Sequence, residues 1–229
     1  MPDGLQIIIT TDGSTSLLNT TLNETYHSIH GAIRESVHVF IKNGLQFWID
    51  ENKAKEISIL EMGFGTGLNT LLSLKESIVQ KIKIHYTSLE ASPISIALAS
   101  QLNYPSQVDV EQCGRLFQQL HTAAWNTPIV ITADFILEKC EGKIQEMDLR
   151  KAKYDLVFFD AFAPAKQPEM WEFSILEKMV HALKPNGVLV TYCAQGQLKR
   201  NLKLLGLLVE SLPGPKGKRE MVRARKIAP

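Results

Sequence analysis

The sequence predicts an α/β fold built on a doubly wound parallel sheet. Segments with strand-like and helical periodicity alternate along most of the chain, a glycine-rich turn joins a strand to a helix near residue 63, and the most apolar strand is followed by an acid. A chain of 229 residues with 45% hydrophobic content can bury a sizeable core. We therefore expect residues 1–229 to form one domain, with residues 1–52 as an N-terminal extension made of a hairpin and a helix.

The glycine-rich turn is the most informative stretch. Residues 56–74 read EISILEMGFGTGLNTLLSL, and their apolar spacing changes from that of a strand to that of a helix. Gly63, Gly65 and Gly67 lie between the two, where they allow positive φ and the close approach of a ligand. The free N–H groups of the following helix suit a polar or anionic ligand.

Two cofactor classes use such a turn. The dinucleotide fingerprint Gly-x-Gly-x-x-Gly would need its third glycine at Leu68, which weakens an interpretation as an NAD site. An ordinary βα turn without a ligand is a further alternative, which three alternating glycines after Glu61 disfavour. This acidic-x-Gly-x-Gly-x-Gly pattern resembles the cofactor loop of class I S-adenosylmethionine-dependent methyltransferases, which have a Rossmann-like fold closed by an antiparallel hairpin.

A second acid supports this cofactor. Glu90 ends the strand predicted over residues 83–89, where an acid can accept hydrogen bonds from both ribose hydroxyls of a nucleoside. Its alternative role is at a solvent-facing helix start, with Ser92 as N-cap and Pro93 at the first helical position. The residues expected to bind the cofactor are Glu61, Gly63, Phe64, Gly65, Gly67, Glu90 and Asp160.

The remaining elements follow in order. Asp12-Gly13 between β-favouring runs predicts a hairpin, and residues 24–45 predict a helix that stops at Asn43-Gly44. Other expected elements are helices over 93–101, 112–121 and 171–183, the last stopped by Pro185-Asn186-Gly187, strands over 135–140, 154–159 and 188–192, and a closing hairpin over 205–225.

Asp160 directly follows the apolar strand 154–159. Because ligands of parallel α/β sheets lie at the carboxyl ends of strands, Asp160 and Glu61 are expected to face one crevice. The loop after Asp160 is stiffened by Ala163-Pro164 and Gln167-Pro168.

Four segments carry a more specific resemblance. They are TYHSIHGAIRESVHVFI (25–41), EMGFGTGLN (61–69), FFDAFAPAKQPEMW (158–171) and GKREM (217–221). Together they resemble the methyltransferases that complete 5-methylaminomethyl-2-thiouridine in tRNA, either the stand-alone MnmD type or the methyltransferase half of bifunctional MnmC.

This resemblance implies S-adenosylmethionine-dependent N-methylation of 5-aminomethyl-2-thiouridine at the tRNA wobble position. The implied partners are the tRNA anticodon loop and a separate enzyme that supplies the aminomethyl precursor. The chain has no fingerprint for FAD, so we expect neither FAD nor a metal. The family's third strand tends to end in Gly-Asp near the adenine, whereas Gly142-Lys143 stands here, which leaves Glu141 and Asp134 as alternatives.

The implied acceptor is a primary amine, which must be uncharged to attack a methyl group. Asp160 is the candidate catalytic residue, first to position the amine and second to hold its departing proton. Phe162 and Pro164 are expected either to wall the substrate pocket or simply to pack.

Charge is unevenly distributed. The net charge is +1, but residues 213–229 carry +5, which leaves −4 elsewhere. Lys216, Lys218 and Arg219 are therefore expected to contact tRNA phosphates. No run of apolar residues predicts a signal peptide or a membrane span, and Cys113, Cys140 and Cys193 fit neither a disulfide framework nor a metal pair, so we expect a cytoplasmic protein.

Other functions remain open. The glycine loop and Asp160 would serve equally well in a methyltransferase for small amines or in an aminopropyl transferase. A non-catalytic RNA-binding module could also retain the fold. The basic tail favours tRNA over a small amine, and cofactor binding would exclude the module. His27, His30 and His38 lack the spacing of a metal site.

Overall fold

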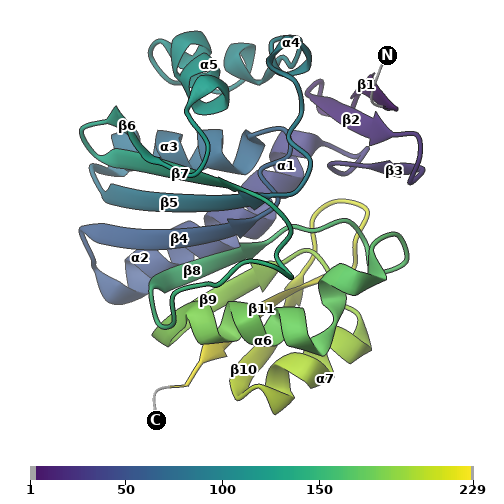
Figure 1. Ribbon diagram of the computed structural model, residues 1–229, viewed down its shortest axis with the longest axis vertical. Helices are drawn as coiled ribbons and strands as arrows, with labels where there is room; N and C mark the ends of the chain where they lie inside the picture. The colour runs from purple at the N-terminus through teal and green to yellow at the C-terminus, as the bar shows by residue number, and fades with distance from the viewer. Residues whose placement is uncertain (1–3, 228–229) are drawn as a thin grey trace.

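The computed structural model in Figure 1 describes residues 4–227 and contains an eight-stranded sheet of order β10-β11-β9-β8-β4-β5-β7-β6. Strands β4, β5, β7, β8 and β9 are parallel, while β6, β10 and β11 pair antiparallel. The doubly wound sheet and the closing hairpin are thus confirmed. The strands are β4 (Glu56–Met62), β5 (Lys83–Glu90), β6 (Pro128–Thr132), β7 (Phe135–Glu141), β8 (Tyr154–Phe159), β9 (Leu183–Thr191), β10 (Leu207–Pro213) and β11 (Glu220–Lys226).

Helices cover both faces of this sheet. Successive side chains of a strand point to opposite faces, and the central strands are apolar on both, so each face needs a covering layer. Ile57 and Ile59 of β4 belong to a core shared with the helices before β6, whereas Leu60 and Met62 pack toward α6 and α7. The helical segments are α1 (Ala32–Ser36), η1 (Val37–Gln46), α2 (Phe47–Asn52), α3 (Leu68–Gln80), α4 (Ile96–Ala99), η2 (Tyr104–Ser106), α5 (Cys113–Thr122), η3 (Pro168–Trp171), α6 (Phe173–Ala182) and α7 (Gly196–Leu204).

A small second sheet precedes these elements. Strands β1 (Leu5–Ile9), β2 (Thr15–Asn19) and β3 (Glu24–Thr25) pair antiparallel in that order, and Ile9 lies opposite Thr15 across the predicted turn. The Asp12-Gly13 hairpin is confirmed. That the whole chain forms one domain stays a prediction.

The helix predicted over residues 24–45 is wrong at both ends. It begins at Ala32, after β3, and continues through the π-helical segment η1 and α2 to Asn52. Gly44 does not stop it. A Cβ atom at Gly44 would lie 2.9 Å from Val190 and 3.2 Å from Phe158, so this glycine lets the helix pack closely on the sheet.

Two smaller boundaries also differ, and two elements are additional. Ser95, not Ser92, caps α4, because its side chain accepts the N–H of Leu98. Pro185-Asn186-Gly187 lies inside β9 at an irregularity in its pairing with β8 rather than ending α6. Strand β6 and helix α7 were not predicted.

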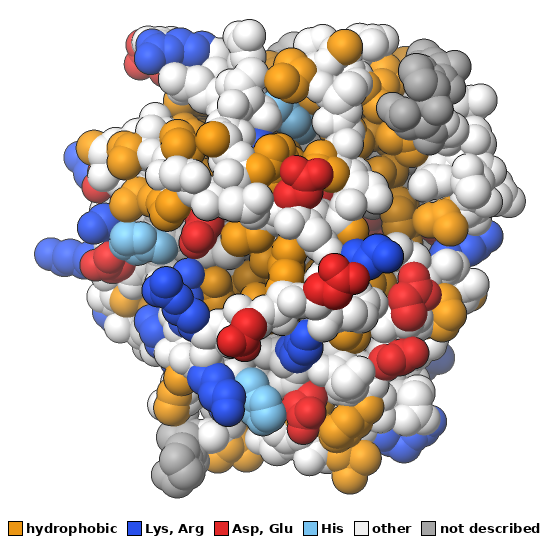
Figure 2. Space-filling model, viewed as in Figure 1, with side chains coloured by type: hydrophobic (Ala, Val, Ile, Leu, Met, Phe, Trp, Pro, Cys, Tyr) orange, Lys and Arg blue, Asp and Glu red, His pale blue; other side chains and the backbone are white. Residues whose placement is uncertain are grey.

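Charged side chains of both signs are interspersed on the face seen in Figure 2, which has no patch of a single sign. Within residues 4–227, no helix combines the length and hydropathy that crossing a membrane requires.

Candidate active site

A cavity of about 1010 Å³ opens at the carboxyl ends of β4, β5 and β8. One side of it is the glycine loop with the ends of β5 and β7. The other side comes from the segment after β3, helix α1, the loop after β8 and the turn between β10 and β11. The polar, aromatic and glycine residues that line it include Tyr26, His27, Glu35, Gly63, Phe64, Gly65, Asn69, Glu90, Lys143, Gln145, Asp160, Phe162, Tyr192 and Lys218.

The glycine loop has the conformation that its sequence predicts. Gly63, Gly65 and Gly67 all have positive φ, at 90°, 50° and 74°. A Cβ atom at Gly63 would lie 3.3 Å from the Asp160 carbonyl oxygen, and one at Gly67 would lie 2.9 Å from His121 Nε2. The loop therefore depends on glycine both for its backbone angles and for space.

Glu90 lies in the cavity, as predicted. Its Oε2 accepts the N–H of Gly65 at 2.9 Å, and its Oε1 accepts the N–H of Ser92 at 2.8 Å. Each carboxylate oxygen can accept a further hydrogen bond. Glu90 thus fixes the glycine loop and still offers acceptors to a ligand.

Glu61 does not line the cavity, contrary to our expectation that it faces the same crevice as Asp160. It is 1% exposed, and its Oε2 accepts the hydroxyls of Ser88 at 2.6 Å and Thr70 at 3.1 Å. Burial raises the pKa of its carboxyl group to about 8, and the nearby Asp160 adds to the shift. Glu61 therefore braces the loop from beneath by joining β4 to β5 and α3.

Neither alternative for the missing acid lines the cavity. Asp134 precedes β7 and so lies at the opposite end of that strand from the cavity. Glu141 is exposed and outside the cavity lining, with its backbone N–H bonded to Asn126. Lys143, Gln145 and the acid Glu146 line this part of the cavity.

Asp160 anchors the other half of the cavity. Its Oδ2 accepts the side-chain N–H of Asn69 at 2.8 Å. Burial and then the charge of Glu35 raise the pKa of the Asp160 carboxyl group to about 7, against the opposing effects of the Asn69 hydrogen bond and of Lys218. Near neutral pH this carboxylate is therefore poised to take up or release a proton.

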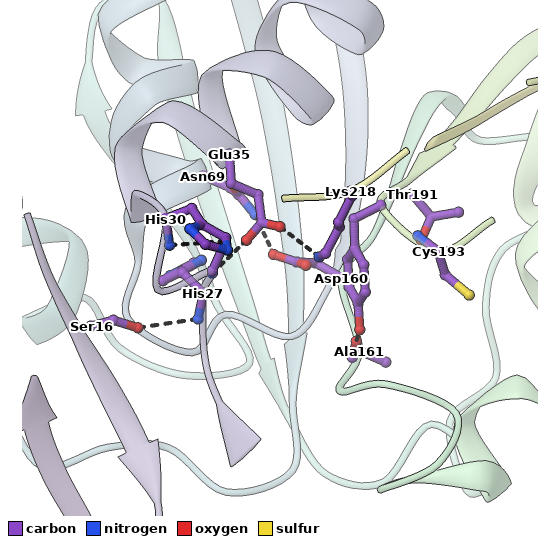
Figure 3. A network of polar contacts seen from close by, with 12 residues as sticks. Ser16, His27, His30, Glu35, Asn69, Asp160, Ala161, Thr191, Cys193 and Lys218 are labelled. Carbon is purple, nitrogen blue, oxygen red and sulfur yellow. Dashed lines mark hydrogen bonds and ion pairs between the residues drawn. The ribbon is translucent and has the colours of Figure 1, made fainter. Parts of the chain in front are cut away.

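Glu35 and Lys218 form an ion pair beside Asp160 (Figure 3). Glu35 Oε1 lies 2.6 Å from Lys218 Nζ, and its Oε2 accepts the N–H of Ser28 at 2.7 Å. The Lys218 ammonium lies 3.7 Å from the centre of the Tyr192 ring. We call Glu35, Asp160, Tyr192 and Lys218 the acceptor chamber.

The basic residues of the closing hairpin therefore do not act as one set. Lys218 points into the cavity, whereas Lys216 and Arg219 are exposed and do not line it. The Lys218 ammonium pairs with Glu35 inside the cavity, and a phosphate contact by any of the three stays a prediction. Sequence periodicity gave no sign of this inward turn.

The two expected wall residues also differ. Phe162 lines the cavity, and its ring meets that of Tyr26 edge to face at 4.9 Å. Pro164 is half-buried and lies outside the lining. Phe162 thus has a place in the site, and Pro164 stiffens the loop behind it.

Sequence reasoning missed Tyr26, His27, Glu35, Asn69 and Tyr192. All of these except Tyr192 lie in the segments 25–41 and 61–69. The resemblance of those segments to a known family is the one sequence feature that could have pointed to them. His27 Nε2 lies 2.7 Å from the Thr66 hydroxyl, and burial lowers the pKa of its ring to about 4, so it is neutral. Among the described residues, no cluster of three or more His, Cys, Asp or Glu side chains could hold a metal ion.

The chain belongs to a family of S-adenosyl-L-methionine-dependent methyltransferases, whose model matches residues 111–227. The bifunctional protein MnmC of tRNA 5-methylaminomethyl-2-thiouridine biosynthesis from Idiomarina loihiensis is 29% identical over 90% of this chain and 36% of its own. Its counterpart from Leptospira interrogans is 30% identical over 87% of this chain and 32% of its own. The chain thus spans about a third of the length of these relatives.

A solved structure extends the similarity to the whole fold. The crystal structure of MnmC2 from Aquifex aeolicus superposes with a TM-score of 0.78 at 28% identity, covering 99% of this chain and 71% of that one. The methyltransferase class predicted from the glycine loop is confirmed, as is the resemblance to the MnmD and MnmC group.

Proposed function

We propose that the protein transfers a methyl group from S-adenosylmethionine to the aminomethyl nitrogen of 5-aminomethyl-2-thiouridine at the tRNA wobble position, giving 5-methylaminomethyl-2-thiouridine. The observation that carries this proposal is the acceptor chamber, where the carboxylate of Asp160, unlike that of Glu35, has no ion-pair partner among the described residues and lies in the same cavity as the glycine loop. A carboxylate of this kind recognises an amine. The MnmC relatives, named for biosynthesis of that nucleoside, support the choice of amine.

The residues present fit S-adenosylmethionine. The backbone of Gly63 to Gly67 and the carboxylate of Glu90 would hold the nucleoside, and Lys143, Gln145 and Glu146 line the cavity after β7. Asn69 Oδ1 is buried and, among the described residues, has no hydrogen-bond partner, which leaves an acceptor for an ammonium group. When bound, the cofactor supplies an electrophilic methyl group whose S–C bond breaks as the C–N bond forms.

Asp160 would act on the acceptor amine. An alkylamine resembles lysine, with a pKa of about 10.4, so most of it is protonated at neutral pH and lacks the lone pair that attack needs. Asp160, with a pKa of about 7, would orient the amine and take up the proton that it loses. Phe162 and Tyr26 would shield this proton transfer from bulk water.

The RNA would approach from the mouth of the cavity. A wobble base must leave its stack to reach a buried pocket, and phosphate contacts would hold the anticodon loop while it does so. Lys216 and Arg219 are exposed on the hairpin turn next to Lys218, which makes them the candidate phosphate contacts. A separate enzyme would supply the aminomethyl precursor, as the resemblance implies.

The proposal is tested with labelled S-adenosylmethionine and tRNA that lacks the final methyl group. After digestion to nucleosides, the label is expected in 5-methylaminomethyl-2-thiouridine. A parallel reaction with small primary amines and diamines tests the alternative substrates. Label in the small amines but not in the tRNA would reject the RNA substrate, while retaining the methyltransferase.

A further inference from the structure

We propose that Lys218 and Glu35 are a positioning pair that keeps the acceptor amine uncharged. In this proposal, Lys218 cancels the charge of Glu35, so that of these two neighbouring carboxylates only Asp160 faces the amine uncompensated. The inference rests on the proposed function, because it needs an amine acceptor. It gives Lys218 a role inside the cavity in place of one on the RNA backbone.

Neighbouring groups hold the Glu35–Lys218 ion pair in place. The Glu35 side chain is 7% exposed and that of Lys218 is 34% exposed, so solvent screens their 2.6 Å contact less than that of a surface pair. The Ser28 N–H holds the second Glu35 oxygen, and the Tyr192 ring lies under the ammonium. Tyr192 is fixed in turn, because its hydroxyl donates to the Ala161 carbonyl at 2.8 Å. Figure 3 shows the side chains of Glu35 and Lys218 meeting beside Asp160.

The backbone around Lys218 keeps it turned inward. His38 Nε2 lies 2.8 Å from the Pro213 carbonyl oxygen, which ties the hairpin turn to the helix that carries Glu35. Gly217 has a φ of +89°, and a Cβ atom there would collide with the His30 ring. The turn therefore packs directly on the segment before α1, and the next residue, Lys218, enters the cavity.

The sign of the effect follows from the charges. Two neighbouring carboxylates would strongly favour the protonated form of an amine placed between them, since opposite charges stabilise the charged form. A fixed ammonium on one carboxylate removes that bias. The amine can then release its proton to Asp160, which changes from carboxylate to carboxylic acid.

Burial holds several neighbouring side chains in one charge state near neutral pH. Burial lowers the pKa of His27 to about 4 and raises that of Tyr26 to about 12, and the pKa of Tyr192 is also raised by burial. Cys193, whose thiol pKa burial raises, stays protonated. Glu61 lies beneath the loop, and the other acids that line the cavity are Glu24, Glu90, Glu146 and Glu169.

Three variants separate this role from simple packing. Lys218→Met leaves Glu35 uncompensated, so the pH profile of kcat/KM should move to higher pH by about one unit or more, with about tenfold less activity at pH 7. Glu35→Gln leaves the ammonium uncompensated and should move the profile to lower pH. The double variant removes both charges and should return the profile toward that of the wild type. Lys203→Met, which removes an exposed lysine of α7, is the control that should leave it unchanged.

A second measurement does not depend on activity. Carbon-13 carboxyl NMR follows the titration of Asp160, whose signal is identified by its loss in Asp160→Asn. The Asp160 titration should move up in Lys218→Met and down in Glu35→Gln. The pairing would be overturned if neither single variant changed the pKa of Asp160. It would also be overturned if both variants lost rate equally at every pH. If the wild type does not methylate the tRNA, the proposed function is rejected. The NMR titration would still test whether Glu35 and Lys218 set the pKa of Asp160.

Discussion

The two halves of the cavity are built in different ways. The cofactor half is nearly continuous in sequence, since one stretch from β4 to the end of β5 supplies the glycine loop and Glu90. The acceptor half collects Glu35, Asp160, Tyr192 and Lys218 from four separate segments, and the ion pair within it joins residues 183 positions apart. The first half is a local motif, and the second exists only after the chain has folded.

This difference also separates what the two halves do. The cofactor half offers backbone N–H groups and one carboxylate, which act on a ligand whether or not reaction occurs. The acceptor half holds buried charges whose effect is on a proton. Changes in the first half should therefore alter binding, and changes in the second should alter rate.

The largest expected effect is on rate, in Asp160→Asn. This variant keeps the size of the side chain but removes the proton acceptor, so single-turnover methylation should slow by about 10²- to 10⁴-fold. The dissociation constant of S-adenosylhomocysteine should change by less than about threefold. Rapid-quench kinetics and calorimetry on the same preparation measure the two quantities. Near-normal turnover would remove Asp160 from the acceptor half.

The next effect is on binding, in Glu90→Ala. The variant loses a charged acceptor that also holds the Gly65 and Ser92 N–H groups, so cofactor affinity should fall by about 1.5–3 kcal/mol, or about 10- to 150-fold. Calorimetric titration with S-adenosylhomocysteine measures it. Glu141→Ala, at the exposed end of β7, is the matched control and should bind normally. Equal losses of affinity in both variants would mean that Glu90 does not bind the cofactor directly.

A smaller effect is expected on stability, in Gly217→Ala. Gly206 has nearly the same φ, +84°, but nothing lies within 4 Å of a Cβ atom there, whereas the Gly217 position also meets His30. Gly206→Ala should therefore cost about 1–2 kcal/mol from backbone strain alone, and Gly217→Ala more. Urea denaturation measures both. Equal costs would show that the turn does not clasp the N-terminal segment closely.

The smallest effect concerns the outer surface. Lys216→Ala and Arg219→Ala should each flatten the salt dependence of tRNA binding, by about 0.7–0.9 log units of slope for each phosphate that the side chain neutralises in the wild type. Lys218 is left intact so that the acceptor chamber is unchanged. Binding measured over a range of salt concentrations gives the slope, and an unaltered slope would place the RNA backbone elsewhere on the protein.

The cofactor half could be predicted because its signals are local. A change of apolar period marks the strand and the helix, and alternating glycines between them mark a backbone approached closely. The same reasoning placed Asp160, since the carboxyl ends of parallel strands share one edge of the sheet. The same reasoning failed for Glu61, because the sequence does not distinguish a carboxylate that faces the cavity from one that is buried beneath the glycine turn.

The acceptor half could not be predicted from such patterns. Glu35 lies on a helix that begins at Ala32 rather than at residue 24 and that continues past Gly44, because this glycine is a packing contact with Val190 and not a stop signal. Lys218 looked like one of several surface lysines, and only the packing of the hairpin turn on His30 directs it inward. Tertiary contacts set both positions, and the sequence period carries no information about them.

The most direct test of this account is a crystal structure with S-adenosylhomocysteine and an anticodon stem-loop that carries the aminomethyl group. We expect the ribose hydroxyls on Glu90, the backbone of Gly63 to Gly67 against the cofactor, and the amine nitrogen in the acceptor chamber within hydrogen-bond distance of Asp160. An amine nitrogen outside the chamber, or a nucleoside that does not touch Glu90, would contradict the division of the cavity into these two halves.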